Sequence, residues 1–203
     1  MEKKYELTDE KMEVMGSLPY SCIKRFWACQ KRGPRRGFIA SESNLSHEAN
    51  CWVDDDAKVF GRVKIYDNAR VYGNAEVCCD ANVYGYAKVC DDARIYGDAA
   101  VFENARIKNS AKVYDNARVY GDAIICGPAL IYNNAKVYGD VIISCSNFTY
   151  EDDINYGNVE IFGDAKVYDS ARIYDAVKIF RNAEIRGLAN IRGNTRIPQD
   201  IKI

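Results

Sequence analysis

Few residues in this chain have the type and spacing that chemistry requires. The sequence holds one histidine, His47, which is the candidate for a general base. No cysteine pair has Cys-x-x-Cys spacing, and a single histidine leaves little for a mixed zinc site. We therefore expect no metal and no cofactor, and we expect the eight cysteines to be inert thiols.

A basic stretch near the N-terminus is the second chemical feature. Its cations are Lys24, Arg25, Lys31, Arg32, Arg35 and Arg36, with no acid among them. The stretch is either a solvated loop of a cap or a contact for an anion or nucleic acid, with Phe26 and Trp27 available to stack. The net charge of the chain is −1, so no global field marks a nucleic-acid binder, and we do not expect that partner.

The element that must position these residues is a six-residue unit, repeated twenty-five times from Cys51 to Asp200 without a change of phase. Position one is Ala in seventeen copies, and position three is Val or Ile in twenty-three. This alternation predicts a short strand with both positions on one side. Gly at position five and Asp or Asn at position six predict a corner.

Stacked parallel coils fit such uniform units, and a helix does not, because the apolar spacing is two and then four. In Val71-Tyr72-Gly73-Asn74-Ala75 an aliphatic residue is followed four residues later by a small one. This pattern resembles the hexapeptide-repeat family. The resemblance implies an all-β fold, a left-handed parallel β-helix of triangular section with three hexads per coil, hence about eight coils here.

A closer resemblance begins before the repeats. Gly37-Phe38-Ile39, Asn44-Leu45-Ser46-His47-Glu48 and Cys51-Trp52-Val53 are similar to the entry segment of YdcK-like bacterial and phage β-helix proteins, often labelled polymer-forming cytoskeletal. That resemblance brings no established activity. We divide the chain into an N-terminal cap, residues 1–50, and a β-helix, residues 51–203. Segments around Gly16 are expected to form a hairpin that covers the first coil.

Three functions stay open at this stage. Many hexapeptide-repeat proteins are acyltransferases that use a histidine base beside the groove for an acyl-coenzyme A donor. Extending the phase backward places His47 on an inward position, which favours a buried cap histidine over that chemistry. A non-enzymatic structural or binding rod is therefore preferred. A phage-encoded decoy that binds a host protein or nucleotide signal is the third reading.

Reading every third hexad sorts the position-four residues into three faces. The first face is expected to carry Phe60, Cys78, Tyr96, Tyr114, Tyr132, Tyr150, Tyr168 and Arg186. The second carries Tyr66, Tyr84, Phe102, Tyr120, Tyr138, Tyr156, Tyr174 and Arg192, and the third, with Phe162 and Phe180 near its end, is mostly small in its middle. Rings stacked from coil to coil would stiffen the rod, and a flat aromatic surface for a ligand is the alternative.

An apolar cluster is expected to point outward around the third face. Ile124, Ile142 and Cys126 lie on that face, and nearby outward positions add Leu130, Phe148 and Ile154. Because outward residues are otherwise charged, the cluster predicts an interface. A homo-oligomer, a dimer or trimer, is the expected partner, and a foreign protein is the alternative.

One coil breaks the core rule, with Asn147, Thr149, Asp153 and Asn155 on inward positions. These residues either pair inside the wall or leave it as a loop of 147–158 that preserves the phase. The candidate irregular site there consists of Tyr150, Glu151, Asp152, Asp153 and Tyr156. The chain has no run of about 18 apolar residues and no signal-peptide core, so we expect a cytoplasmic protein without a membrane partner.

Overall fold

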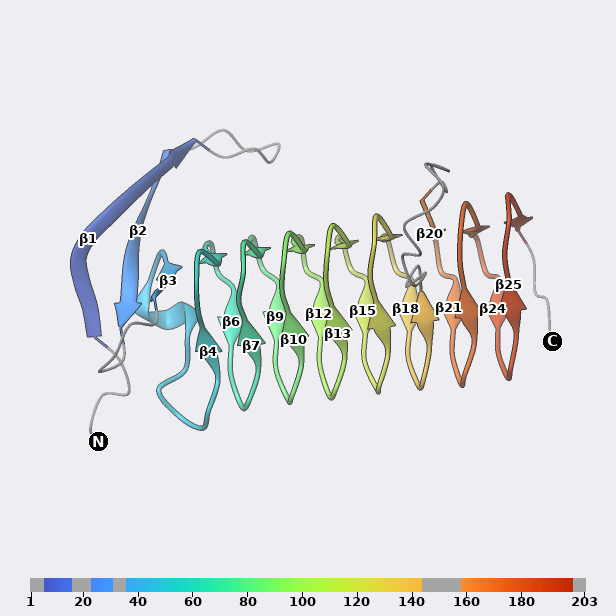
Figure 1. Cartoon of the computed structure of the whole chain (residues 1–203), viewed down its shortest axis with the longest axis horizontal. Coiled ribbons are helices and arrows are strands. Elements are labelled where there is room, and N and C mark those ends of the chain that lie inside the picture. The colour runs from blue at the N-terminus through green and yellow to red at the C-terminus, as the bar shows by residue number, and fades with distance from the viewer. Residues whose placement is uncertain (1–5, 16–22, 31–35, 144–157, 199–203) are drawn as a thin grey trace, which may run out of the picture.

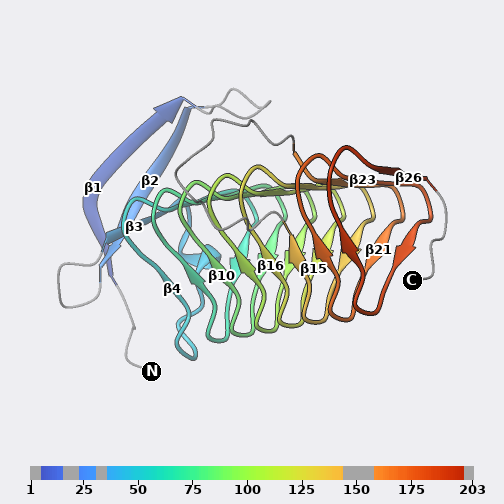
Figure 2. The same cartoon turned by 45° about the vertical axis from the view of Figure 1, so that its right-hand side comes forward.

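A computed structural model describes residues 6–15, 23–30, 36–143 and 158–198, with side chains from residue 37 onward. The described chain forms a rod of stacked coils, with an antiparallel hairpin at its N-terminal end (Figure 1). In an oblique view, the coils close around the rod axis (Figure 2), and their strands pair from coil to coil into three sheets. The rod is a parallel β-solenoid, as the repeat predicts.

The described strands form three sheets. Sheet A contains β1 (Glu6–Met15), β2 (Ile23–Gln30), β3 (Arg36–Ile39), β5 (Lys58–Val59), β8 (Glu76–Val77), β11 (Arg94–Ile95), β14 (Lys112–Val113), β17 (Leu130–Ile131), β20 (Glu160–Ile161), β23 (Lys178–Ile179) and β26 (Arg196–Ile197). Sheet B contains β6 (Lys64–Ile65), β9 (Asn82–Val83), β12 (Ala100–Val101), β15 (Arg118–Val119), β18 (Lys136–Val137), β21 (Lys166–Val167) and β24 (Glu184–Ile185). Sheet C contains β4 (Trp52–Val53), β7 (Arg70–Val71), β10 (Lys88–Val89), β13 (Arg106–Ile107), β16 (Ile124–Ile125), β19 (Ile142–Ile143), β22 (Arg172–Ile173) and β25 (Asn190–Ile191).

The core is a single column that runs through the coils. Position one and position three are buried in almost every described hexad, whereas position two is at least partly exposed in all of them except the first, where Trp52 is buried. Val113, for example, is fully buried and lies in register with Ile95 and Ile131 of the neighbouring coils. The predicted core, parallel coils and triangular section are confirmed, and the left hand of the helix stays a prediction.

Strand pairing changes its step once. It advances by three hexads per coil up to β17, but β17 then pairs with β20, and Leu130 lies opposite Glu160, five hexads later. The pairing of β18 with β21 and of β19 with β22 takes the same longer step. The register between paired strands thus skips two hexads between residues 143 and 159. The faces predicted for the residues beyond 143 are therefore wrong.

The corners depend on a left-handed backbone at position five. Gly97 has a φ of 70°, and Asp115, the equivalent residue one coil later, has a φ of 57°. A β-carbon on Gly97 would lie 2.7 Å from the backbone nitrogen of Asp115, so this corner has no room for a side chain. The carboxylate of Asp115 accepts a hydrogen bond from the N–H of Asn133 at 3.1 Å, which ties this corner to the next coil.

The N-terminal edge of the rod is closed by the entry segment. Strand β3 pairs antiparallel with β2 and parallel with β5, so the predicted hairpin forms and extends sheet A. After η1 (Glu42–Asn44), a 3-10 helix, Leu45 makes a parallel bridge to Ile65 of sheet B. Parallel solenoid pairing thus starts at Phe38. The division at residue 50 stays a prediction.

Asn44 completes this closure. Its side chain is 1 % exposed, and its amide nitrogen donates to the carbonyl oxygens of Gly61 and Val63, each at 3.0 Å. Its amide oxygen accepts from the N–H of Ser41 at 2.9 Å. The side chain therefore replaces the N–H groups that a preceding strand would supply to the edge of sheet B.

We expect Asn44→Ala to destabilise the fold by about 1–3 kcal/mol, because buried carbonyl groups lose their donor. Asn74→Ala is the matched control, since the exposed Asn74 amide donates only to the surface carboxylate of Asp92. Thermal melting followed by circular dichroism measures both. Equal melting temperatures for the two variants would show that Asn44 does not hold the edge.

Candidate functional site

A continuous aromatic ladder runs along sheet B. Its rings belong to Tyr66, Tyr84, Phe102, Tyr120, Tyr138 and Tyr168. Successive ring centroids lie 4.7 to 5.0 Å apart, and the planes deviate by at most 6°. The face of each inner ring is therefore covered by its two neighbours.

A second ladder runs along sheet A through Tyr96, Tyr114, Tyr132, Phe162 and Phe180. Phe162 takes the place predicted for Tyr150, because Tyr132 stacks on it at 4.9 Å across the longer step. Burial is the main cause that raises the pKa of Tyr96 and Tyr114, so their hydroxyls stay neutral. Covered ring faces favour a stiffening role for both ladders over the alternative of a flat aromatic surface for a ligand.

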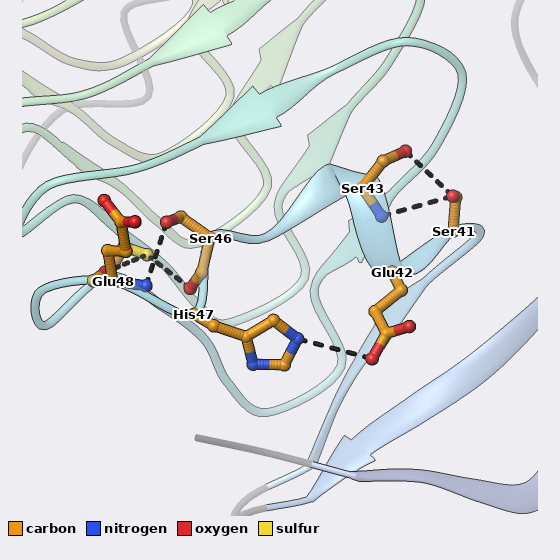
Figure 3. A network of polar contacts seen from close by, with 7 residues as sticks. Ser41, Glu42, Ser43, Ser46, His47 and Glu48 are labelled. Carbon is orange, nitrogen blue, oxygen red and sulfur yellow. Dashed lines mark hydrogen bonds and ion pairs between the residues drawn. The ribbon is translucent and has the colours of Figure 1, made fainter. Parts of the chain in front are cut away.

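His47 lies in the entry segment. The repeat phase predicted an inward ring, but the ring is half-buried, and its Nε2 lies 3.3 Å from a carboxylate oxygen of Glu42 (Figure 3). Nearby, the hydroxyl of Ser46 accepts a hydrogen bond from the N–H of Glu48. In the described ranges, no group of three or more His, Cys, Asp or Glu could hold a metal ion. The contact to Glu42 is typical of a histidine that fastens a turn.

The outward apolar pair lies in the middle of sheet C. Ile124 and Ile142 are register neighbours on β16 and β19, and both are partly exposed. Leu130 lies on sheet A, between Lys112 and Glu160 in the register, and is also partly exposed. The structure thus brings the two isoleucines together and puts Leu130 on the next side of the rod.

A row of cations occupies the N-terminal half of the same sheet. Arg70, Lys88 and Arg106 are register neighbours on β7, β10 and β13, and all three are exposed. A hollow of about 310 Å³ opens beside them. It is lined by Asp54, Asp55, Arg70, Tyr72 and Lys88. The row is visible in the sequence as a basic residue at position two of every third hexad, but the hollow has no signal there.

Comparison with known proteins agrees with this architecture. The model of the YdcK β-solenoid repeat matches residues 63–78 and 111–127, within the regular coils. These two stretches are thus similar to the YdcK repeat, and the described chain around them forms a parallel β-solenoid. No curated protein matches it. Among the described residues, no helix reaches the length and apolar character that crossing a bilayer requires.

Several predicted site residues of this solenoid fall outside the described structure. The irregular site (Tyr150, Glu151, Asp152, Asp153, Tyr156) and the apolar members Phe148 and Ile154 lie outside the described residues. In the basic stretch the same holds for Lys31, Arg32 and Arg35. Lys24, Arg25 and Arg36 lie on described strands, but their side chains are not described.

The cysteines of the described coils are not all alike. Cys51, Cys78, Cys79 and Cys90 form no disulfide, as expected. Cys126 is disulfide-bonded, so the expectation of inert thiols is wrong at this position. Its side chain is 3 % exposed, and it therefore contributes almost no surface to the apolar pair beside it.

Proposed function

We propose that the protein is a non-enzymatic rod that binds through sheet C. The observation that carries this proposal is the outward pair Ile124 and Ile142, side by side on adjacent strands. Their register neighbours further along the column, Arg106 and Arg172, are charged and exposed. A local apolar zone on an otherwise charged surface is typical of a protein contact.

A second copy of the chain is the partner that we propose. Cys126, two residues after Ile124, is buried and adds no protruding side chain to the surface. Another rod can therefore approach Ile124 closely. Arg106 and Arg172 limit the apolar zone to two coils, which are ~4.8 Å apart. Stable interfaces bury about 800 Å² per partner, so a zone this short favours a dimer or trimer that dissociates on dilution.

Replacing Ile124 and Ile142 by Glu is expected to convert the oligomer into monomers without loss of β-structure, because repelling carboxylates replace the apolar contact. Light scattering over a range of concentrations measures the mass. Asn82→Glu with Ala100→Glu is the matched control. It adds the same charge at position two of two adjacent coils, on sheet B.

Two results would contradict self-association through this zone. One is a wild-type chain that stays monomeric at high concentration, in which case the zone would be reassigned to a foreign protein. The other is an equal loss of mass in the Asn82 and Ala100 control, which would place the contact elsewhere or trace it to net charge alone.

A further inference from the structure

We propose that the cation row Arg70, Lys88 and Arg106, with the hollow beside it, is a binding site for a small ligand that carries several phosphate groups. This inference goes beyond self-association and uses a different part of sheet C. It rests on three observations: the like charges in register, the absence of acidic partners for them in the described structure, and the shape and lining of the hollow.

The three cations stand directly opposite one another on adjacent strands. Strands in a sheet are ~4.8 Å apart, and like charges directly opposite each other destabilise a sheet. In the described part of the chain no carboxylate lies within ion-pair distance of Arg70, Lys88 or Arg106. The row is thus a concentrated positive charge that an anion would neutralise.

Sheet A shows that the repeat can avoid this arrangement. There Glu76 lies in register between Lys58 and Arg94, and the Glu76 carboxylate lies 3.5 Å from the guanidinium of Arg94. Further along, Glu160 accepts a hydrogen bond from Lys178 at 2.7 Å. Glu76 and Glu160 interrupt the bases on that face, where at most two cations are adjacent, so the row of three on sheet C is not a requirement of the fold.

Sheet B carries a similar row of cations, but one of its members is paired with an acid. Arg118, Lys136 and Lys166 are register neighbours, but Lys166 donates a hydrogen bond of 2.6 Å to Glu184. None of these three residues lines the hollow beside Arg70 and Lys88. The sheet B row therefore serves as a comparison that has similar charge but lies apart from that hollow.

The hollow is lined by two kinds of charged group. Arg70 and Lys88 are cations, and a guanidinium suits the paired oxygens of a phosphate group. Asp54 and Asp55 also line the hollow, and the Asp55 carboxylate accepts a hydrogen bond from the N–H of Gly73 at 3.0 Å. Carboxylates accept hydrogen bonds, so they suit hydroxyl or amino groups of the same ligand.

Tyr72 also lines the hollow, and it adds no charge. A hydrogen bond with the Cys90 thiol, together with burial, raises the pKa of Tyr72 to about 12, so the phenol stays neutral. The row of cations ends at Ile124 on the next coil. Three charges over about 10 Å suit a small polyvalent anion, since a nucleic acid would need a longer basic track.

Titration calorimetry of the full-length chain with inorganic tripolyphosphate at 0.15 M salt tests the site. We expect saturable binding by the wild type, and at least tenfold weaker binding by the Arg70→Ser, Lys88→Ser double variant. Both residues are exposed, so this variant should keep its circular dichroism spectrum and melting temperature. The Arg118→Ser, Lys136→Ser variant removes the same charges from sheet B and should bind like the wild type.

Three outcomes would overturn the proposal. The first is no saturable binding of tripolyphosphate by the wild type. The second is an equal loss of affinity in the two double variants, which would mean attraction by charge alone. The third is equally tight binding of citrate, a carboxylate anion, which would contradict the phosphate class. The Ile124 and Ile142 double Glu variant should retain binding, so failure of self-association does not affect this test.

Discussion

Val113→Asp is expected to unfold the rod or to cost more than about 4 kcal/mol of stability, a loss at the extreme of single substitutions. The side chain of Val113 is fully buried between Ile95 and Ile131 of the adjacent coils. Its surroundings in the core column are apolar, so a carboxylate there would have no partner to offset its lost hydration.

Lys112→Asp is the matched control, because it places the same side chain one residue away on the outer surface. Lys112 is partly exposed and lies between Arg94 and Leu130 in the register. We expect its melting temperature to stay close to that of the wild type. Equal thermal melting of the two variants would contradict the inward and outward assignment of the whole repeat.

Gly97→Ala is expected to produce the second large effect. The glycine has a φ of 70°, where an L-residue costs about 1–2 kcal/mol. The added methyl group would also lie 2.7 Å from the backbone nitrogen and 2.9 Å from the carbonyl oxygen of Asp115. Moving that backbone would disturb the hydrogen bond from the N–H of Asn133 to the Asp115 carboxylate. Overpacking of this kind adds about 1–3 kcal/mol.

Gly193→Ala separates the two causes. Its φ of 78° gives a similar backbone strain, but no atom lies within 4 Å of the position that a β-carbon would take. We expect a smaller loss of melting temperature for Gly193→Ala than for Gly97→Ala, measured by circular dichroism. If the two losses are the same, contact between successive corners does not select glycine at position five.

The sequence by itself determined the coil. Period-two alternation within each hexad fixes which side chains are buried, and residues that tolerate a left-handed backbone fix the corners. Both signals are local, and they recur in every unit, so the core at Val113 and the corner at Gly97 could be predicted. The cation row of Arg70, Lys88 and Arg106 could also be read by taking position two of every third hexad.

Only the tertiary structure decided which coils are neighbours after residue 143. Two hexads preserve the phase of the repeat whether they lie in the wall or outside it. The polar residues on inward positions therefore left both arrangements open, and the phase alone could not predict the longer step from Leu130 to Glu160. Because of this step, Tyr132 stacks on Phe162, and every later residue lies on a different face from the predicted one.

Closure of the first edge and the shape of the hollow were likewise decided by tertiary structure. Asn44 precedes the hexads, and its role depends on the carbonyls of Gly61 and Val63, which only packing brings to its amide. The hollow depends on residues from three coils, Asp54, Tyr72 and Lys88 among them. Local pattern determines each strand, whereas a site assembled from several coils depends on how those coils stack.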